Sequence, residues 1–206
     1  MRRWWLSLLV LVSCLALPAQ AAPTPKVMSI IEWMNYETRM SDMIVLGQVS
    51  SDAAPHAQSG EVRAVLKVGE IFHGPKVGPM VLVTIKSGYR GGQYTVPAPL
   101  LKDQWVLIWL RSEGGRWVAP PVGRVVETPY KGLTFYPGYN IVLSDASPSL
   151  SWEYVLDSLS QLVATRREII NGHMPALRAA TTTEQRDRVK LNIEWQVKEH
   201  LGLPVP

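Results

Sequence analysis

Cysteine is almost absent from this sequence. Cys14 is the only one among 206 residues, and it lies inside an apolar stretch that we expect to be removed. A mature chain without cysteine excludes disulfides, thiol catalysis and cysteine-ligated metal sites together. With 47% hydrophobic residues, the chain is long enough to be held by a packed core alone.

A hydrophobic run long enough to span a membrane is also missing. Trp4–Leu17 is apolar, but a spanning helix needs roughly 18 or more such residues. Two arginines precede this run, and a proline and an Ala-Gln-Ala sequence ending at Ala21 follow it, which is the order of a secretory signal peptide. We therefore predict a signal peptide at residues 1–21 and export to the periplasm or the outside of the cell.

The segment Leu11–Cys14 leaves an alternative open, because it resembles a bacterial lipobox. In that case Cys14 would carry a lipid anchor and become the first residue of an envelope lipoprotein. The apolar stretch continues past this cysteine to Leu17, and only thirteen residues precede it. We therefore favour cleavage after Ala21.

Neither sign of charge dominates the expected mature chain. Without Arg2 and Arg3, 19 basic residues remain against 17 acidic ones, a net charge of +2. Basic residues gather in the C-terminal segment, at Arg166, Arg167, Arg178, Arg186, Arg188 and Lys190. Acidic residues interleave with them, which favours a solvated helix surface over a phosphate-binding patch. We predict no nucleic-acid partner.

Recognisable catalytic and metal-binding motifs are missing as well. The histidines are scattered along the chain, at His56, His73, His173 and His200. None has another ligand residue at metal-binding spacing on a shared element, so we interpret them as structural or solvated. No serine lies in a Gly-x-Ser-x-Gly or Ser-x-x-Lys motif. The sequence therefore predicts no catalytic residue, no cofactor and no metal.

What the sequence does contain is a set of β-type runs. In Glu61–Phe72 apolar and polar residues alternate, which is typical of a strand with one buried face. Gln104–Leu110 is apolar from Trp105 onward, so we expect a central strand with both faces covered. Trp105 and Trp109 share one face of it, for which the barrel interior is one candidate. Three further strands are expected at Asp42–Ser50, Met80–Ile85 and Arg116–Ala119.

Helical patterns flank these strands. We expect helices at Val27–Arg39, from Ser149 to about Asn171, and at Thr182–Leu201. Thr182 and Gln185 fit a capping box, and Glu194 and Lys198 fit a favourable i,i+4 ion pair. Short β-type pieces between residues 122 and 144 predict an extra hairpin on the barrel.

Three of these runs together resemble a known family. The runs are Ser41–Val49, Val62–Gly74 and Lys102–Leu110. They are similar to exported bacterial domains related to the tissue inhibitors of metalloproteinases and the netrin modules. The resemblance covers about residues 30–120, and it implies a five-stranded OB-type Greek-key barrel.

Two departures limit what the resemblance implies about function. In the inhibitors, the mature N-terminal cysteine supplies its amine and carbonyl to the protease zinc. Here the first mature residues would be Ala22-Pro23-Thr24, and Asp103 replaces the glycine that precedes the later strand in the family. We therefore transfer no functional residue from the family.

The stretch Gly88–Tyr94 is the best candidate for a binding loop. It presents two tyrosines and an arginine on a glycine-rich reversal, and loops of OB barrels do recognise ligands. The candidate binding residues are Tyr89, Arg90, Gln93 and Tyr94. The alternative is an ordinary hairpin whose tyrosines fold back on the sheet.

These observations predict a fold that is mainly β with α. We expect a five-stranded OB-type Greek-key barrel with a short N-terminal helix and two C-terminal helices. The expected divisions are the signal peptide at 1–21, the barrel domain with its extra hairpin at 22–145, and a helical segment packed on the barrel at 146–206.

The predicted function is that of an exported, non-enzymatic binding or inhibitor-like module, not an enzyme. It would act through loops at one barrel end on a protein in the cell envelope or outside the cell. The alternative is an extracytoplasmic, hydrolase-type enzyme whose site cannot be recognised in the sequence.

Overall fold

The computed structural model describes residues 27–28, 30–90, 93–119, 125–126, 133–136, 140–143 and 150–201. The predicted signal peptide at 1–21 and the candidate lipidation site Cys14 lie outside the described residues. The strands are β1 (Val27–Met28), β2 (Met43–Val49), β3 (Val62–His73), β4 (Met80–Ile85), β5 (Gly88–Arg90), β6 (Gln93–Thr95), β7 (Trp105–Glu113), β8 (Arg116–Ala119), β9 (Val125–Val126), β10 (Leu133–Tyr136) and β11 (Asn140–Leu143). The helices are α2 (Ile30–Met40), α3 (Leu150–Ala179) and α4 (Thr183–His200).

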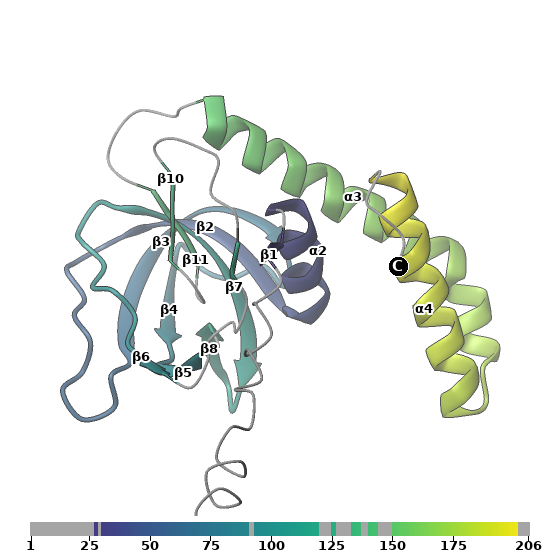
Figure 1. Cartoon of the computed structure of the whole chain (residues 1–206), viewed down its shortest axis with the longest axis horizontal. Coiled ribbons are helices and arrows are strands. Elements are labelled where there is room, and N and C mark those ends of the chain that lie inside the picture. The colour runs from purple at the N-terminus through teal and green to yellow at the C-terminus, as the bar shows by residue number, and fades with distance from the viewer. Residues whose placement is uncertain are drawn as a thin grey trace, which may run out of the picture.

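In the described part of the chain, five strands close into a barrel in the order β2-β3-β4-β8-β7 and back to β2 (Figure 1). Neighbouring strands are antiparallel except for β4 and β8, which run parallel. This is the Greek-key arrangement of an OB-type barrel. The β10–β11 hairpin continues the sheet outward from β7. The structure thus confirms the predicted fold, including one short helix before the barrel and two helices after it. The first helix begins later than predicted, at Ile30, because Val27 and Met28 form β1, which pairs with β9 in parallel.

The barrel strands follow the hydrophobic pattern of the sequence. In β3, Val62, Ala64 and Leu66 are buried while Arg63 and Lys67 are exposed, which confirms the predicted alternation. In β7, every residue from 106 to 110 is buried. A strand is apolar at consecutive positions when both of its faces are covered. Here one face of β7 lines the barrel and the other lies under the helices.

Two separate cores result from this arrangement. The barrel core fills the inside of the barrel, and its fully buried members include Met43, Val45, Leu66, Ile108 and Leu110. The helix-facing core lies between the outer wall of the barrel and the helices, and it includes Trp33, Ile44, Leu107, Trp109 and Leu159. Strands β2 and β7 contribute alternate residues to both cores, so they form a wall that the two cores share.

The candidate placement of Trp105 and Trp109 in the barrel interior is wrong. Trp109 points outward into the helix-facing core, where its ring centroid lies 4.7 Å from that of Trp33. Its Nε1 donates to Thr38 Oγ1 over 3.3 Å. Trp105 is 38% exposed and packs on the outside against Gly69. The smaller Val106 and Ile108 occupy the inside instead.

Helix α3 runs past the predicted end near Asn171. It continues through Gly172 and Pro175 to Ala179, because its C-terminal half packs against α4. Figure 1 shows this half extending beyond the barrel with α4 beside it. Among the described residues, no helix is both long and apolar enough to cross a membrane.

Helix α4 begins with the predicted capping box. Thr182 Oγ1 accepts from the Gln185 backbone N–H at 3.2 Å, and Gln185 Oε1 accepts from the Thr182 N–H at 3.3 Å. The predicted ion pair between Glu194 and Lys198 is wrong. Glu194 instead pairs across helices with Arg166, because that side chain is buried beside it.

Candidate functional site

The predicted binding residues lie on the β5–β6 hairpin at the lower end of the barrel in Figure 1. The hairpin forms its own two-stranded sheet, in which Tyr89 pairs with Tyr94 and Arg90 with Gln93. The structure thus brings the four backbone positions together. Their side chains lie outside the described part of the structure, so the binding role of the hairpin stays a prediction.

The outer face of β3 and β4 carries exposed apolar side chains. Leu82 is 58% exposed and Met80 is 51% exposed. In the register, Leu82 pairs with Val65 and Met80 with Lys67. Together with Arg63, these residues form a surface that we call the β3–β4 wall. The alternation in the sequence predicted a solvent-facing side of β3. Only the strand pairing shows that Leu82 and Met80 of β4 lie beside this side of β3.

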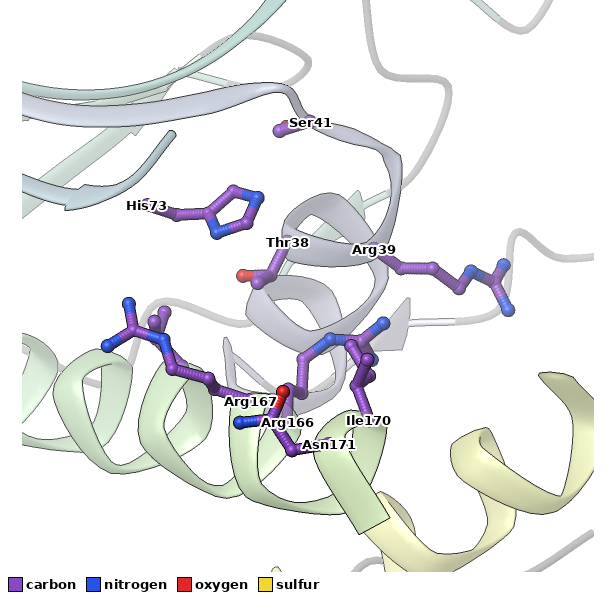
Figure 2. A pocket seen from close by; sticks show the side chains of 9 residues that line it. Thr38, Arg39, Ser41, His73, Arg166, Arg167, Ile170 and Asn171 are labelled. Carbon is purple, nitrogen blue, oxygen red and sulfur yellow. The ribbon is translucent and has the colours of Figure 1, made fainter. Parts of the chain in front are cut away.

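A cavity of about 220 Å³ lies where α2, the end of β3 and the middle of α3 meet (Figure 2). Figure 2 shows His73 and Ser41 on one side of it and α3 on the other, with Thr38 between them. We call this the basic cavity. Its lining consists of Thr38, Arg39, Ser41, His73, Val163, Arg166, Arg167, Ile170 and Asn171.

Local backbone geometry places His73 in this cavity. The next residue, Gly74, has φ +106°, and a Cβ there would lie 2.5 Å from the Asp42 carbonyl oxygen. Only glycine fits this conformation and this close approach. The end of β3 is therefore held against the segment before β2, which brings His73 next to Ser41. On α3, the lining residues recur at three- and four-residue spacing and so share one helix face.

Arg166 contradicts the interpretation of the C-terminal arginines as a solvated surface. It is only 8% exposed. Its guanidinium binds both carboxylate oxygens of Glu194, at 2.9 and 3.1 Å, and donates to Asn35 Oδ1 at 3.1 Å. The prediction of a solvated helix surface is confirmed for the other basic residues, which are exposed: Arg167, Arg178, Arg186, Arg188 and Lys190. Because Arg166 and its partners are far apart in the chain, no local pattern marks their contact.

The surroundings of His73 disfavour the protonated form of its imidazole. Desolvation lowers the pKa of His73, and the positive charges of Arg167 and Arg166 lower it further, while Asp42 acts in the opposite direction. His73 is exposed at the end of β3, as expected for a solvated histidine, but its ring faces the arginines of α3 across the cavity (Figure 2).

A second depression, of about 540 Å³, adjoins the basic cavity and lies between α2, α3 and α4. The two share Arg39, Arg166 and Ile170. Leu177, Leu191 and Ile193 give the second depression its apolar character. We call it the apolar groove. Neither depression could be predicted from the sequence, because each combines residues of α2 with residues of α3 that follow more than a hundred positions later.

The other histidines and acidic residues do not assemble a metal centre among the described residues, where no three potential ligands lie close enough to hold an ion. His173 Nε2 is instead hydrogen-bonded to Gln196 Oε1 at 3.0 Å. Comparisons with models of protein families and with curated proteins gave no match. The resemblance to metalloproteinase inhibitors and netrin modules therefore stays a prediction, and function is argued from the geometry.

Proposed function

We propose that this protein is an exported, non-enzymatic binding module, inhibitor-like in presenting a surface to a partner. The partner would be a protein in the cell envelope or outside the cell, bound on the β3–β4 wall and the adjoining β5–β6 hairpin. The exposure of Leu82 and Met80 on this wall carries the proposal.

The position of the wall supports a binding role. OB-type barrels commonly bind their ligands on the face of the second and third barrel strands. In this chain those strands are β3 and β4. The β5–β6 hairpin follows directly after β4 in the chain and lies at the barrel end that β4 reaches (Figure 1).

The chemistry of the wall favours a protein over a nucleic acid. Its described centre is aliphatic, with Val65 beside Leu82, and Arg63 and Lys67 are exposed at its margin. An apolar centre with a charged rim is the usual anatomy of a protein interface. Single-stranded nucleic acids are bound instead by aromatic side chains on which the bases stack.

Site-specific photo-crosslinking tests this proposal. A photoreactive amino acid at position 82 should crosslink to a defined protein from an envelope extract, and one at position 40 should not. Met40 is a suitable control because it is 42% exposed, close to the 51% of Met80, but lies at the end of α2.

The affinity of the purified partner for the Leu82→Ser and Met80→Ser variants should then be lower than for the wild type by about tenfold or more. Truncation of a central interface residue typically causes a loss of affinity of this size. Met40→Ser should bind like the wild type. A Tyr89→Ala, Tyr94→Ala double variant tests the hairpin separately. Equal affinity of wild type, Leu82→Ser and Met80→Ser would contradict a role of the wall.

A further inference from the structure

The basic cavity and the apolar groove are neighbouring depressions with different chemistry. Arg39, Arg166 and Ile170 line both of them. We propose that the two depressions together bind a single-chain anionic amphiphile. Its acidic head group would occupy the basic cavity, and its alkyl chain would lie along the apolar groove.

The head-group end offers an excess of positive charge. Among the described residues, Arg39 and Arg167 make no ion pair, whereas Arg166 is neutralised by Glu194. Arg39 does lie over the Tyr36 ring, 5.1 Å from its centroid. An oxyanion near Arg167 would therefore meet a positive charge that no described ion pair neutralises, while Asp42 is the carboxylate that acts on this cavity, through His73.

Neutral donors accompany this charge. Thr38 Oγ1 already accepts from the Trp109 indole, so its own O–H remains to be donated. Ser41 and Asn171 add a hydroxyl and an amide to the lining. In Figure 2, Arg167 and Asn171 rise from α3 below His73 and Thr38, so the donors come from both sides of the cavity. A group with several acceptor oxygens, such as a phosphate, can satisfy donors on both sides at once.

The opposite end is suited to an alkyl chain. Leu177 and Ile170 are partly buried on α3, and Leu191 on α4 is 69% exposed at the edge of the groove. A chain lying here would remove exposed apolar surface from water, which is favourable. The charged residues at this end pair with each other, since Lys190 Nζ lies 3.3 Å from Asp187 Oδ1.

The arrangement also fixes the orientation and the number of chains. Arg39 lines both depressions, but Arg167 lines only the basic cavity, so the acidic head group is expected at the end that Arg167 lines. A groove of about 540 Å³ lies within the size range of small-molecule sites, and it accommodates one chain. The ligand is therefore a monomeric, single-chain amphiphile and not a phospholipid within a bilayer.

Calorimetric titration with three matched compounds tests the proposal on the full exported chain. Dodecyl phosphate, used below its critical micelle concentration, carries both the head and the chain. Inorganic phosphate carries only the charge, and dodecyl maltoside carries only the chain. We expect dodecyl phosphate to bind at least about tenfold more tightly than either of the others. Equal binding of dodecyl maltoside or of inorganic phosphate would overturn the proposal.

Three variants locate the site. Arg167→Gln should weaken dodecyl phosphate binding by about tenfold or more, because a charge-assisted hydrogen bond is lost. Arg178→Gln should not, since Arg178 lies on the same helix and is exposed but lines neither depression. Leu191→Ser should weaken dodecyl phosphate binding and leave inorganic phosphate binding unchanged.

Three results would overturn the proposal at this stage. The first is an equal loss of affinity in Arg167→Gln and Arg178→Gln, which would indicate unspecific attraction to a basic helix. The second is undiminished dodecyl phosphate binding by both Arg167→Gln and Leu191→Ser. The third is association with phosphatidylglycerol vesicles without binding of the monomeric compound.

Discussion

At Gly47 the backbone of β2 passes so close to β3 that no side chain fits between them. A Cβ at this position would lie 2.9 Å from Leu66 Cβ and 3.0 Å from the Lys67 carbonyl oxygen. The strand register shifts between Leu46 and Gly47, which marks a bulge or irregularity in the β2–β3 pairing. A glycine within an apolar strand predicts such a feature, so this residue could be interpreted from the sequence.

Replacement of Gly47 by alanine should therefore destabilise the fold. We expect Gly47→Ala to lower the free energy of unfolding by about 1–3 kcal/mol, because the added methyl group overpacks the sheet. Gly172→Ala is the matched control. It lies in the interior of α3 with nothing within 4 Å of an added Cβ, and it should raise the free energy of unfolding by about 0.5–1 kcal/mol. Urea denaturation measures both, and a similar effect of the two substitutions would contradict the explanation.

Residues whose role depends on distant partners could not be predicted in this way. Period-two alternation shows that Trp105 and Trp109 share a face, but it does not say which face is inside. The orientation of Trp109 depends on α2, which provides Trp33 and Thr38 as its partners outside the barrel. In the same way, the charge pattern around Arg166 is typical of an exposed helix. Only the packing of α4 against α3 explains why the Arg166 side chain is buried.

At the level of elements, one arginine links the three helices. Arg166 on α3 binds Glu194 on α4 and Asn35 on α2. Both charged side chains are largely removed from water, with side-chain exposures of 10% and 20%. Removing one partner of such a pair leaves a charge buried and uncompensated.

We expect Glu194→Ala to lower the free energy of unfolding by about 3 kcal/mol or more. Glu184→Ala removes a carboxylate from the same helix, but the pair of Glu184 with Arg188 has side-chain exposures of 77% and 78%. An exposed i,i+4 pair contributes about 0.3–0.5 kcal/mol, so this variant should remain close to the wild type. Chemical denaturation compares the two. Equal stability of both variants would show that Arg166 finds water or another partner when Glu194 is lost.

The elements themselves were largely predictable, whereas the depressions between them were not. Strands such as β4 and β8 follow from short apolar runs and from the turns around them, and they begin and end where the sequence predicts. The end of α3 was missed because Gly172 and Pro175 are local helix breakers, while packing against α4 sustains the helix. The basic cavity combines α2, β3 and α3, so its lining has no counterpart in any continuous stretch of sequence.

At the scale of the whole molecule, the wall formed by β2 and β7 joins the two cores. Neighbouring residues of one strand enter different cores, as Ile44 and Val45 do in β2. A strand cannot keep one face packed if the other face loses its partners and the strand distorts. The barrel and the helices packed on it should therefore unfold as one cooperative unit.

Substitution in either core tests this coupling. Leu66 in the barrel core and Leu159 in the helix-facing core are both fully buried, at 0% exposure. Leu66→Ala and Leu159→Ala should each lower the free energy of unfolding by about 2–5 kcal/mol. Urea unfolding is followed by far-UV circular dichroism for the helices and by amide hydrogen exchange of β3 for the barrel, and the two transitions should coincide in both variants. If Leu159→Ala instead lost its helical signal at a lower urea concentration than the protection of β3, the helices would unfold from a barrel that remains intact, and the shared wall would not couple the two cores.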